Sequence, residues 1–206
     1  MDRLSFNAMA AINEDRLIRQ QLSNDIANVT TVGFKQTFEA TIQPHQAVGE
    51  GFDSRLQPRL YTTDRVRLDA GPLMVTGRDL DVSLNNKTVM GVMGNDGKLA
   101  FTRRGDLRVN PNGVLETGSG HMVQGQDGGP ITIPVGSRIN ITKTGEIFAS
   151  DPTQQGVPQE QVVGILMLRD ASTTHLIKRE DGLFRVDEKP LGTDFATGPE
   201  PVSLTP

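Results

Sequence analysis

The chain has 206 residues, enough for one well-packed domain with a smaller element beside it. Its net charge is −4 and it contains one tyrosine and no tryptophan, which argues against nucleic acid as the main partner. Cysteine is absent, so disulfides and thiolate metal sites are excluded. No apolar run approaches the ~20 residues of a spanning helix, so we expect no direct membrane insertion.

The N-terminal segment has the periodicity of an amphipathic helix. Spacings that are mostly of three and four residues place one set of apolar side chains on a single face: Leu4, Ala8, Ala11, Ile12, Ile18, Leu22, Ile26 and Val29. Asp15 interrupts this stripe. Its narrowness and its alanines favour packing against another helix, and packing on the chain's own core is the alternative. Residues 1–30 lack the apolar core and cleavage site of a secretory signal, so we expect none to be cleaved.

The predicted helix stops near residue 28. Asn28 tolerates a left-handed backbone and Gly33 favours one. Residues 29–32 are all β-branched and disfavour a further helical turn. The chain is therefore predicted to become extended a few residues before Phe34.

The rest of the chain divides into a middle region and a C-terminal region. Prolines and glycines within residues 43–59 predict a loop or linker. We therefore divide the chain into an N-terminal amphipathic assembly helix at 1–35, an extended linker region at 36–70 and a β-rich outer domain at 71–206.

From residue 71 onward, short apolar segments alternate with turn signals. The pairs Asp-Gly at 96–97 and Asn-Gly at 112–113 suit turns with positive φ. Strands at intervals of ~8–12 residues predict a sandwich or barrel. The most hydrophobic run, Val162–Leu168, is predicted to be the central core strand. The predicted fold is mainly β with an N-terminal α-helix (α+β): a β-sandwich or barrel-like domain of short antiparallel strands on a long amphipathic helix.

Candidate catalytic or metal-binding residues are few. His45, His121 and His175 lie far apart, lack ligand spacing, and are predicted to be surface or capping residues. Asp79 and Asp81 would share one face of a strand, where a metal site is conceivable. Outward-facing polar positions explain this pair better.

Two further motifs have plain structural interpretations. Gly118-Ser119-Gly120 lacks the context of a dinucleotide-binding loop and is predicted to be a hairpin loop. Arg103-Arg104 could pair with an acidic partner, but is predicted to lie in a solvated turn. We therefore predict that the protein is not an enzyme and holds no cofactor or metal.

Several segments resemble, in the same order, motifs of the bacterial flagellar rod and hook family. The first is Asn24-x-x-Ala27-Asn28-x-x-Thr31-x-Gly33-Phe34-Lys35, at the predicted end of the helix. Residues 76–84 (Thr-Gly-Arg-Asp-Leu-Asp-Val-Ser-Leu) and 101–107 (Phe-Thr-Arg-Arg-Gly-Asp-Leu) resemble two more. Residues 128–134 and 181–185 point within the family to a proximal-rod member.

This resemblance implies a structural subunit of the flagellar basal-body rod, assembled by helix packing with other rod subunits, with further copies of this chain as one option. It also implies export by the flagellar type III machinery without a cleaved signal, and a periplasmic place in the basal body. The predicted assembly interface comprises Leu4, Ala8, Ala11, Ile12, Ile18, Leu22, Ile26, Asn28, Gly33 and Phe34.

Members of this family close with a second amphipathic helix that pairs with the N-terminal one. Residues 201–206 contain two prolines and no helical periodicity. We therefore expect a truncated chain, or one whose C-terminal segment is missing, in which the N-terminal helix lacks its usual partner.

Three alternatives stay open at this point. The chain is a distal-rod or hook sibling of the same family, a β-rich binding module on a helical oligomerisation stalk, or a β-rich hydrolase of cell-wall polymers. A binding module needs an aromatic groove or exposed apolar patch, and few aromatic residues are available. A hydrolase needs two opposed carboxylates in a cleft, and no motif for them is visible.

Overall fold

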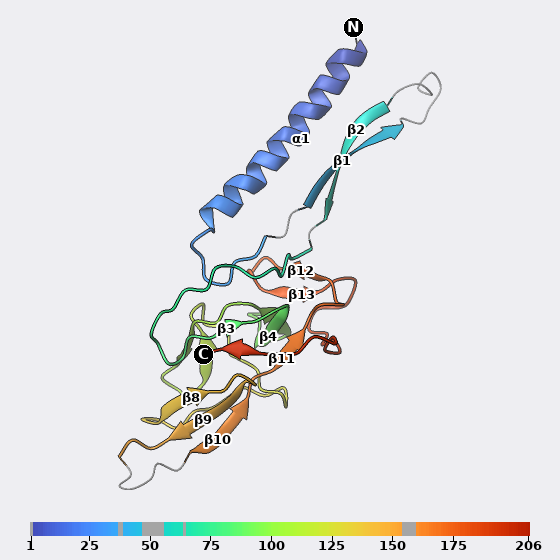
Figure 1. Ribbon diagram of the computed structural model, residues 1–206. Coiled ribbons are helices and arrows are strands. Elements are labelled where there is room, and N and C mark those ends of the chain that lie inside the picture. Colours follow the sequence, from blue (N-terminus) through green and yellow to red (C-terminus); the bar gives the residue numbers. More distant parts are fainter. Residues whose placement is uncertain (1, 37–38, 47–55, 64, 154–159) are drawn as a thin grey trace. The chain divides into compact units, whose positions relative to one another are not determined.

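A computed structural model describes residues 2–36, 39–46, 56–63, 65–153 and 160–206 (Figure 1). The chain forms two compact units. The first, the helical unit, comprises Met1–Thr31 with Gln36–Arg65, and the second, the β domain, comprises Val32–Lys35 with Val66–Pro206. The four residues Val32–Lys35 therefore belong to the β domain, although the chain on either side of them belongs to the helical unit.

The helical unit contains one helix and one β-hairpin. Helix α1 spans Asp2–Ala27 and contacts strand β2. Strands β1 (Glu39–Gln46) and β2 (Leu56–Thr63) pair antiparallel. The predicted loop at 43–59 is wrong at both ends, because both strands extend into it and Pro44 lies opposite Pro58. In a two-stranded sheet both strands are edge strands. Proline is tolerated there because its missing N–H can fall on the side of the strand that has no neighbour.

The β domain is built from short strands. They are β3 (Ser83–Leu84), β4 (Thr88–Met93), β5 (Leu99–Thr102), β6 (Leu107–Val109), β7 (Leu115–Thr117), β8 (Arg138–Ile141), β9 (Glu146–Ser150), β10 (Gln161–Ile165), β11 (Leu168–Asp170), β12 (Leu176–Lys178), β13 (Phe184–Val186) and β14 (Leu204–Thr205). The predicted turns at 96–97 and 112–113 are confirmed, with φ of 71° at Gly97 and 78° at Gly113.

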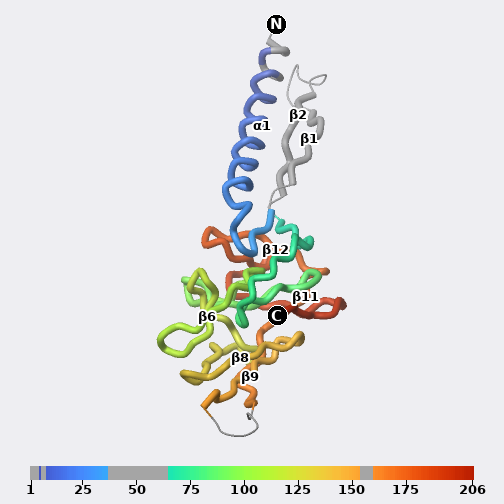
Figure 2. Tube along the Cα trace, turned by 60° about the vertical axis from the view of Figure 1, so that its left-hand side comes forward, coloured from blue at the N-terminus to red at the C-terminus, as the bar shows by residue number. Residues whose placement is uncertain are grey.

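These strands pair antiparallel in several small sheets. The largest has the order β11-β4-β5-β13-β12, and a three-stranded sheet has the order β10-β9-β8. Two-stranded pairs join β6 with β7 and β14 with β3. Within the β domain, β12 and the three-stranded sheet lie at opposite ends in both views (Figures 1 and 2).

The core of the β domain consists of two apolar clusters. The larger includes Met90 and Val92 of β4 together with side chains from β6 to β9. The smaller is centred on Phe101 and Phe195, whose rings meet edge to face at 4.9 Å. Strand β4 supplies residues to both clusters, because its alternate side chains point to opposite sides of the sheet.

The prediction of Val162–Leu168 as one central strand is wrong. The run is divided between β10 and β11, and β10 is an edge strand on which Val162 is 52% exposed. A register shift between Val162 and Gly164 interrupts its pairing with β9. The buried central strands are instead β4 and β5 of the five-stranded sheet. Strand order decides which strand has neighbours on both sides, and the apolar content of one run does not.

The prediction of a mainly β chain with an N-terminal helix is confirmed. The sandwich or barrel arrangement stays a prediction. Among the described residues, no helix is both long enough and apolar enough to cross a membrane.

Candidate functional site: the helix stripe and its anchor

The apolar stripe predicted on the N-terminal helix is exposed along most of its length. Ile12, Leu22 and Ile26 are 55–68% exposed, and Ala8 and Ala11 are exposed with them. Ile18 is half-buried, and Leu4 lies in α1 with its side chain outside the described part. Large apolar side chains on one exposed face of a helix are typical of an interaction surface.

A different face of α1 is partly covered. The half-buried positions recur every three or four residues, and most of them are polar: Ala10, Glu14, Ile18, Gln21, Asp25 and Asn28. Hydrogen bonds along this face join Gln21 to Asp25 at 3.1 Å and Gln36 to Asp25 at 3.2 Å. The helix therefore meets the described part of its own chain through polar side chains and leaves the apolar stripe unoccupied.

The helix ends through the side chain of Asn28. Its amide Nδ2 donates to the Asn24 carbonyl at 2.9 Å, and its own carbonyl accepts from the Thr31 N–H at 2.9 Å. Asn28 does not adopt a positive φ. The predicted end of the helix is thus confirmed, but this asparagine acts through hydrogen bonds, while the left-handed conformation is found at Gly33, with φ of 72°.

Gly33 lies directly on the backbone of the β domain. A Cβ atom at this position would lie 2.6 Å from the Arg104 Cα and 2.8 Å from the Arg103 carbonyl carbon. No real Cβ makes such a contact, and the positive φ independently favours glycine. We call Val32–Lys35 the anchor segment, because here the chain leaving α1 is seated on the β domain.

The two residues after Gly33 hold the same segment. The Lys178 ammonium lies 4.7 Å from the centre of the Phe34 ring, a cation–π contact. The Lys35 ammonium donates to the Asp69 carbonyl. Burial, and next the charge of Arg103, lower the pKa of Lys35, while the Asp69 carboxylate acts in the opposite direction.

Arg103, whose backbone Gly33 contacts, has a buried side chain. The prediction that Arg103 lies in a solvated turn is therefore wrong. Its guanidinium donates to the carbonyls of Leu84 at 2.7 Å, Asn86 at 2.7 Å and Thr88 at 3.0 Å. Burial lowers its pKa. The sequence contains one sign of this burial. Side chains two residues apart in an extended chain share a face, and Arg103, directly after β5, thus shares a face with the buried Phe101.

Arg104, by contrast, is half-buried and forms a bidentate ion pair with Asp106 at 2.6 and 2.8 Å. That hydrogen bond raises the pKa of Arg104, against the effect of burial. The predicted interface residues Gly33 and Phe34 thus contact their own β domain, whereas the stripe residues lie on the helix.

The described residues contain no group of three or more side chains that could hold a metal ion. His175 is exposed, as predicted. His121 is buried in the turn after β7, where its main-chain N–H donates to the Thr117 hydroxyl at 3.2 Å. The side chain of His45 lies outside the described part. The Gly118–Gly120 turn is a hairpin loop, as predicted, with φ of 89° at Gly120.

Known proteins resemble this chain over most of its length. Residues 87–149 match the family model of the flagellar hook protein FlgE/F/G D1 domain. The flagellar basal-body rod protein FlgF of Salmonella typhimurium is 35% identical over 190 residues, which cover 90% of this chain and 72% of that protein. FlgF of Escherichia coli is 31% identical, covering 94% and 75%. The flagellar basal-body rod protein FlgG of Bacillus subtilis is 32% identical, covering 66% and 57%.

Proposed function

This chain belongs to the FlgF family of flagellar basal-body rod proteins, and from that premise we propose that the apolar stripe of α1 is the surface through which it assembles. The protein is a structural subunit of the rod and not an enzyme. In this proposal α1 joins a tubular bundle with helices of neighbouring rod subunits, and the β-rich domain lies on the outside. The same proposal includes the division of the chain into an assembly helix at 1–35, a linker region at 36–70 and an outer domain at 71–206. It also includes a sandwich-like packing of the strands in the outer domain.

The observation that carries this proposal is the exposure of Ile12, Leu22 and Ile26 on one face of α1. Burying a leucine or isoleucine side chain contributes about 1.5–3 kcal/mol. If each subunit buries a few such side chains against its neighbours, their summed free energy of burial favours assembly of the rod strongly. The alanines Ala8 and Ala11 leave room for another helix to approach closely.

The partners and location follow from the same family membership. We infer assembly with other rod subunits and with further copies of this chain, export by the flagellar type III machinery, and a periplasmic site without a cleaved signal. The distal-rod and hook siblings are the second candidate, since FlgG relatives also match. They match no better than the FlgF relatives.

The test is a charge placed in the stripe. Leu22→Asp or Ile26→Asp should abolish assembly of rods in cells that lack the native gene, as seen by electron microscopy of basal bodies, because a buried carboxylate would be left without a partner. The β domain should still unfold at the parent temperature, because neither side chain belongs to its core.

Gln20→Asp is the matched control, since Gln20 is exposed on the side of α1 away from the stripe. This variant should assemble like the parent. Normal rods from Leu22→Asp and Ile26→Asp, or normal rods in cells that lack the protein altogether, would contradict the proposal.

A further inference from the structure

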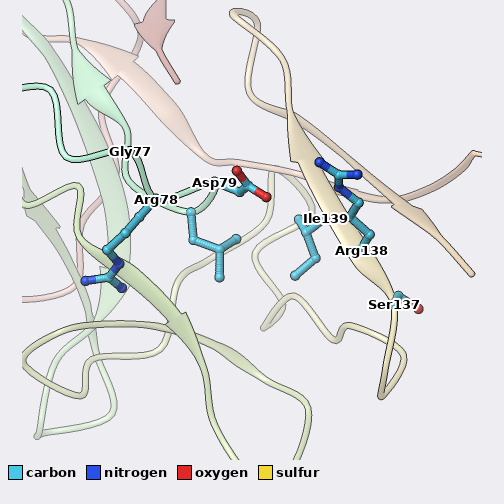
Figure 3. A pocket seen from close by; sticks show the side chains of 7 residues that line it. Gly77, Arg78, Asp79, Ser137, Arg138 and Ile139 are labelled. Carbon is cyan, nitrogen blue, oxygen red and sulfur yellow. The ribbon is translucent and has the colours of Figure 1, made fainter. Parts of the chain in front are cut away.

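A shallow pocket of about 430 Å³ lies beside β8 and is lined by residues 77–80 and 137–139 (Figure 3). Asp79 lies beside Arg78 in this lining, and the Arg78 Nε is also 3.6 Å from the Asp81 carboxylate. The pocket therefore mixes both signs of charge, and its arginine is already paired. The exposed face of α1, by contrast, has an ordered pattern of apolar and charged side chains.

This face of α1 contains a seam with the spacing of a coiled coil. Six positions, separated alternately by four and three residues, lie along one side of the helix: Ala8, Ile12, Asp15, Arg19, Leu22 and Ile26. A spacing that averages 3.5 residues keeps one line of side chains facing a second helix along its whole length. All six residues are exposed. We call them the α1 seam.

Two charged residues lie in the middle of the α1 seam. The Arg19 guanidinium is 2.8 Å from the Asp15 carboxylate, and these two side chains are 78% and 57% exposed. A helix that covers the apolar positions on either side also covers this pair. The covering helix should therefore place an acidic group opposite Arg19 and a basic group opposite Asp15, because like charges in contact oppose binding.

The same helix, running in the opposite direction, meets this requirement. If two copies of α1 pair antiparallel about Leu17, each seam residue faces the residue at the same distance on the other side of Leu17. The opposed pairs, each formed twice, are Ala8 with Ile26, Ile12 with Leu22 and Asp15 with Arg19. Apolar side chains thus meet apolar side chains, and each charge meets its opposite.

Parallel pairing of two copies gives a worse match. In register, Asp15 would lie opposite Asp15, and Arg19 opposite Arg19. With a shift of one heptad, Asp15 would face Leu22 and Arg19 would face Ile12, which buries charge against apolar side chains. Polar residues within a seam are known to fix the direction and register of a helix pair. Here they favour the antiparallel one.

We propose that the free subunit pairs with a second copy of itself through the α1 seam, with the two helices antiparallel. A two-fold axis at Leu17 relates the two copies, so the contact is isologous and closes on itself. A rod extends by repeating one head-to-tail operation, which keeps all its helices in one direction. The antiparallel pair must therefore open before α1 enters the rod. The inference rests on the proposed function of the stripe and adds the partner that covers it before assembly.

The pair should be weak enough to reopen. Its apolar burial comes mainly from Ile12, Leu22 and Ile26. The charged layers fix the direction of the helices and contribute little stability of their own. Arg16 lies beside the seam near the two-fold axis, so the two exposed copies of this arginine repel each other across the pair.

The absence of native cysteine allows a direct test of the direction. Chains carrying Ala8→Cys and Ile26→Cys, with tags of different length, are mixed and oxidised with copper phenanthroline. The mixed disulfide dimer should exceed about tenfold that from Ala8→Cys with Gln20→Cys, whose exposed position lies away from the seam. Each seam variant alone should give little dimer, because equal positions lie roughly 27 Å apart along an antiparallel pair.

An exchange of charges tests the central layers. Asp15→Arg alone and Arg19→Asp alone should each weaken self-association about tenfold in sedimentation equilibrium, because like charges would then meet. A mixture of these two variants should pair again, because every charged layer of the mixed pair joins opposite charges. This recovery shows that neither variant has lost its helix.

Three results would overturn the inference: a mixed disulfide yield equal to that of the control, a dominant dimer of Ala8→Cys with itself, or failure of the two charge variants to pair. The proposed function is judged separately. If the antiparallel cross-link is absent while Leu22→Asp abolishes rods, the pair is wrong and the proposed function stands. If the cross-link forms and Leu22→Asp gives normal rods, the reverse holds.

Discussion

Gly33 is the residue at which the chain leaving helix α1 meets the β domain. Its positive φ and its contact with the backbone of Arg103 and Arg104 are two separate reasons for glycine. A turn would require only the first. The glycine in the motif that ends α1 is thus explained by the close approach of two segments that lie about seventy residues apart in the chain.

Gly33→Ala should release the anchor segment. Gly182→Ala is the matched control, because Gly182 has a φ of 80° but open space where the methyl group of an alanine would lie. The control should lose about 1 kcal/mol from backbone strain alone. Gly33→Ala should additionally make the bond after Lys35 sensitive to trypsin and its neighbouring amides exchange quickly. Equal protease sensitivity in both variants would show that the close contact is unimportant.

Whether the environment of a single residue could be predicted from sequence depended on where in the chain its contacting groups lie. Gly33 and the turns at Gly97 and Gly113 were predictable because a glycine reports its own backbone. Arg103 was missed, because the carbonyl groups that its guanidinium contacts belong to another segment, Leu84–Thr88. No local pattern contains that information, apart from the alternation that pairs Arg103 with Phe101.

At the scale of elements, Asp170 at the end of β11 joins that strand to the last residues of the chain. Its carboxylate accepts from the Ser172 N–H at 2.9 Å, the Ser172 hydroxyl at 2.6 Å and the Glu200 N–H at 2.8 Å. Burial by itself raises the pKa of Asp170, but these hydrogen bonds and Lys87 outweigh it and hold the pKa below its ordinary value.

Asp170 should therefore make the β domain sensitive to acid. A carboxyl whose pKa is lowered on folding stabilises the protein above its unfolded pKa, near 4, and loses that contribution as the pH falls through the folded value. Asp170→Asn should cost about 1–3 kcal/mol at pH 7. The deficit should shrink below about pH 4 in urea unfolding. Glu180→Gln, at an exposed position, should show neither effect, and a constant deficit for Asp170→Asn would contradict the assignment.

Turns with their own sequence signals were predicted well, as Gly97 between β4 and β5 and Gly113 between β6 and β7 show. The order of strands was not predicted. Val162–Leu168 was the most apolar run, yet its first part became an edge, because the sheet places β4 and β5 between other strands. The hairpin of β1 and β2 was missed because its prolines suggested a loop.

For the whole molecule, the two units differ in how much they depend on partners. The β domain buries two apolar clusters of its own, whereas α1 leaves its apolar stripe exposed. The N-terminal helix was predictable from sequence, because helical periodicity can be recognised without knowledge of the fold. What covers the stripe was not predictable from periodicity, and only the family motifs suggested an answer.

This difference should appear in limited proteolysis. In dilute monomer, trypsin should cut α1 at the exposed Arg16 and Arg19, because isolated helices are only marginally stable, while the β domain stays intact. At concentrations that allow assembly, α1 should become resistant, and Leu22→Asp should keep it sensitive throughout. A dilute monomer in which α1 resists digestion would show that the helix needs no partner.

The acceptors around the anchor segment have one more consequence. Arg103 and Lys35 both donate to main-chain carbonyls, and Phe34 offers a ring face to Lys178. Main-chain oxygens and aromatic rings do not titrate, so acidification that neutralises Asp170 removes no acceptor here. The hydrogen bonds and the cation–π contact named here therefore have no acidic acceptor, and a rod subunit that meets acid should lose the hydrogen bond between Asp170 and Glu200 before them.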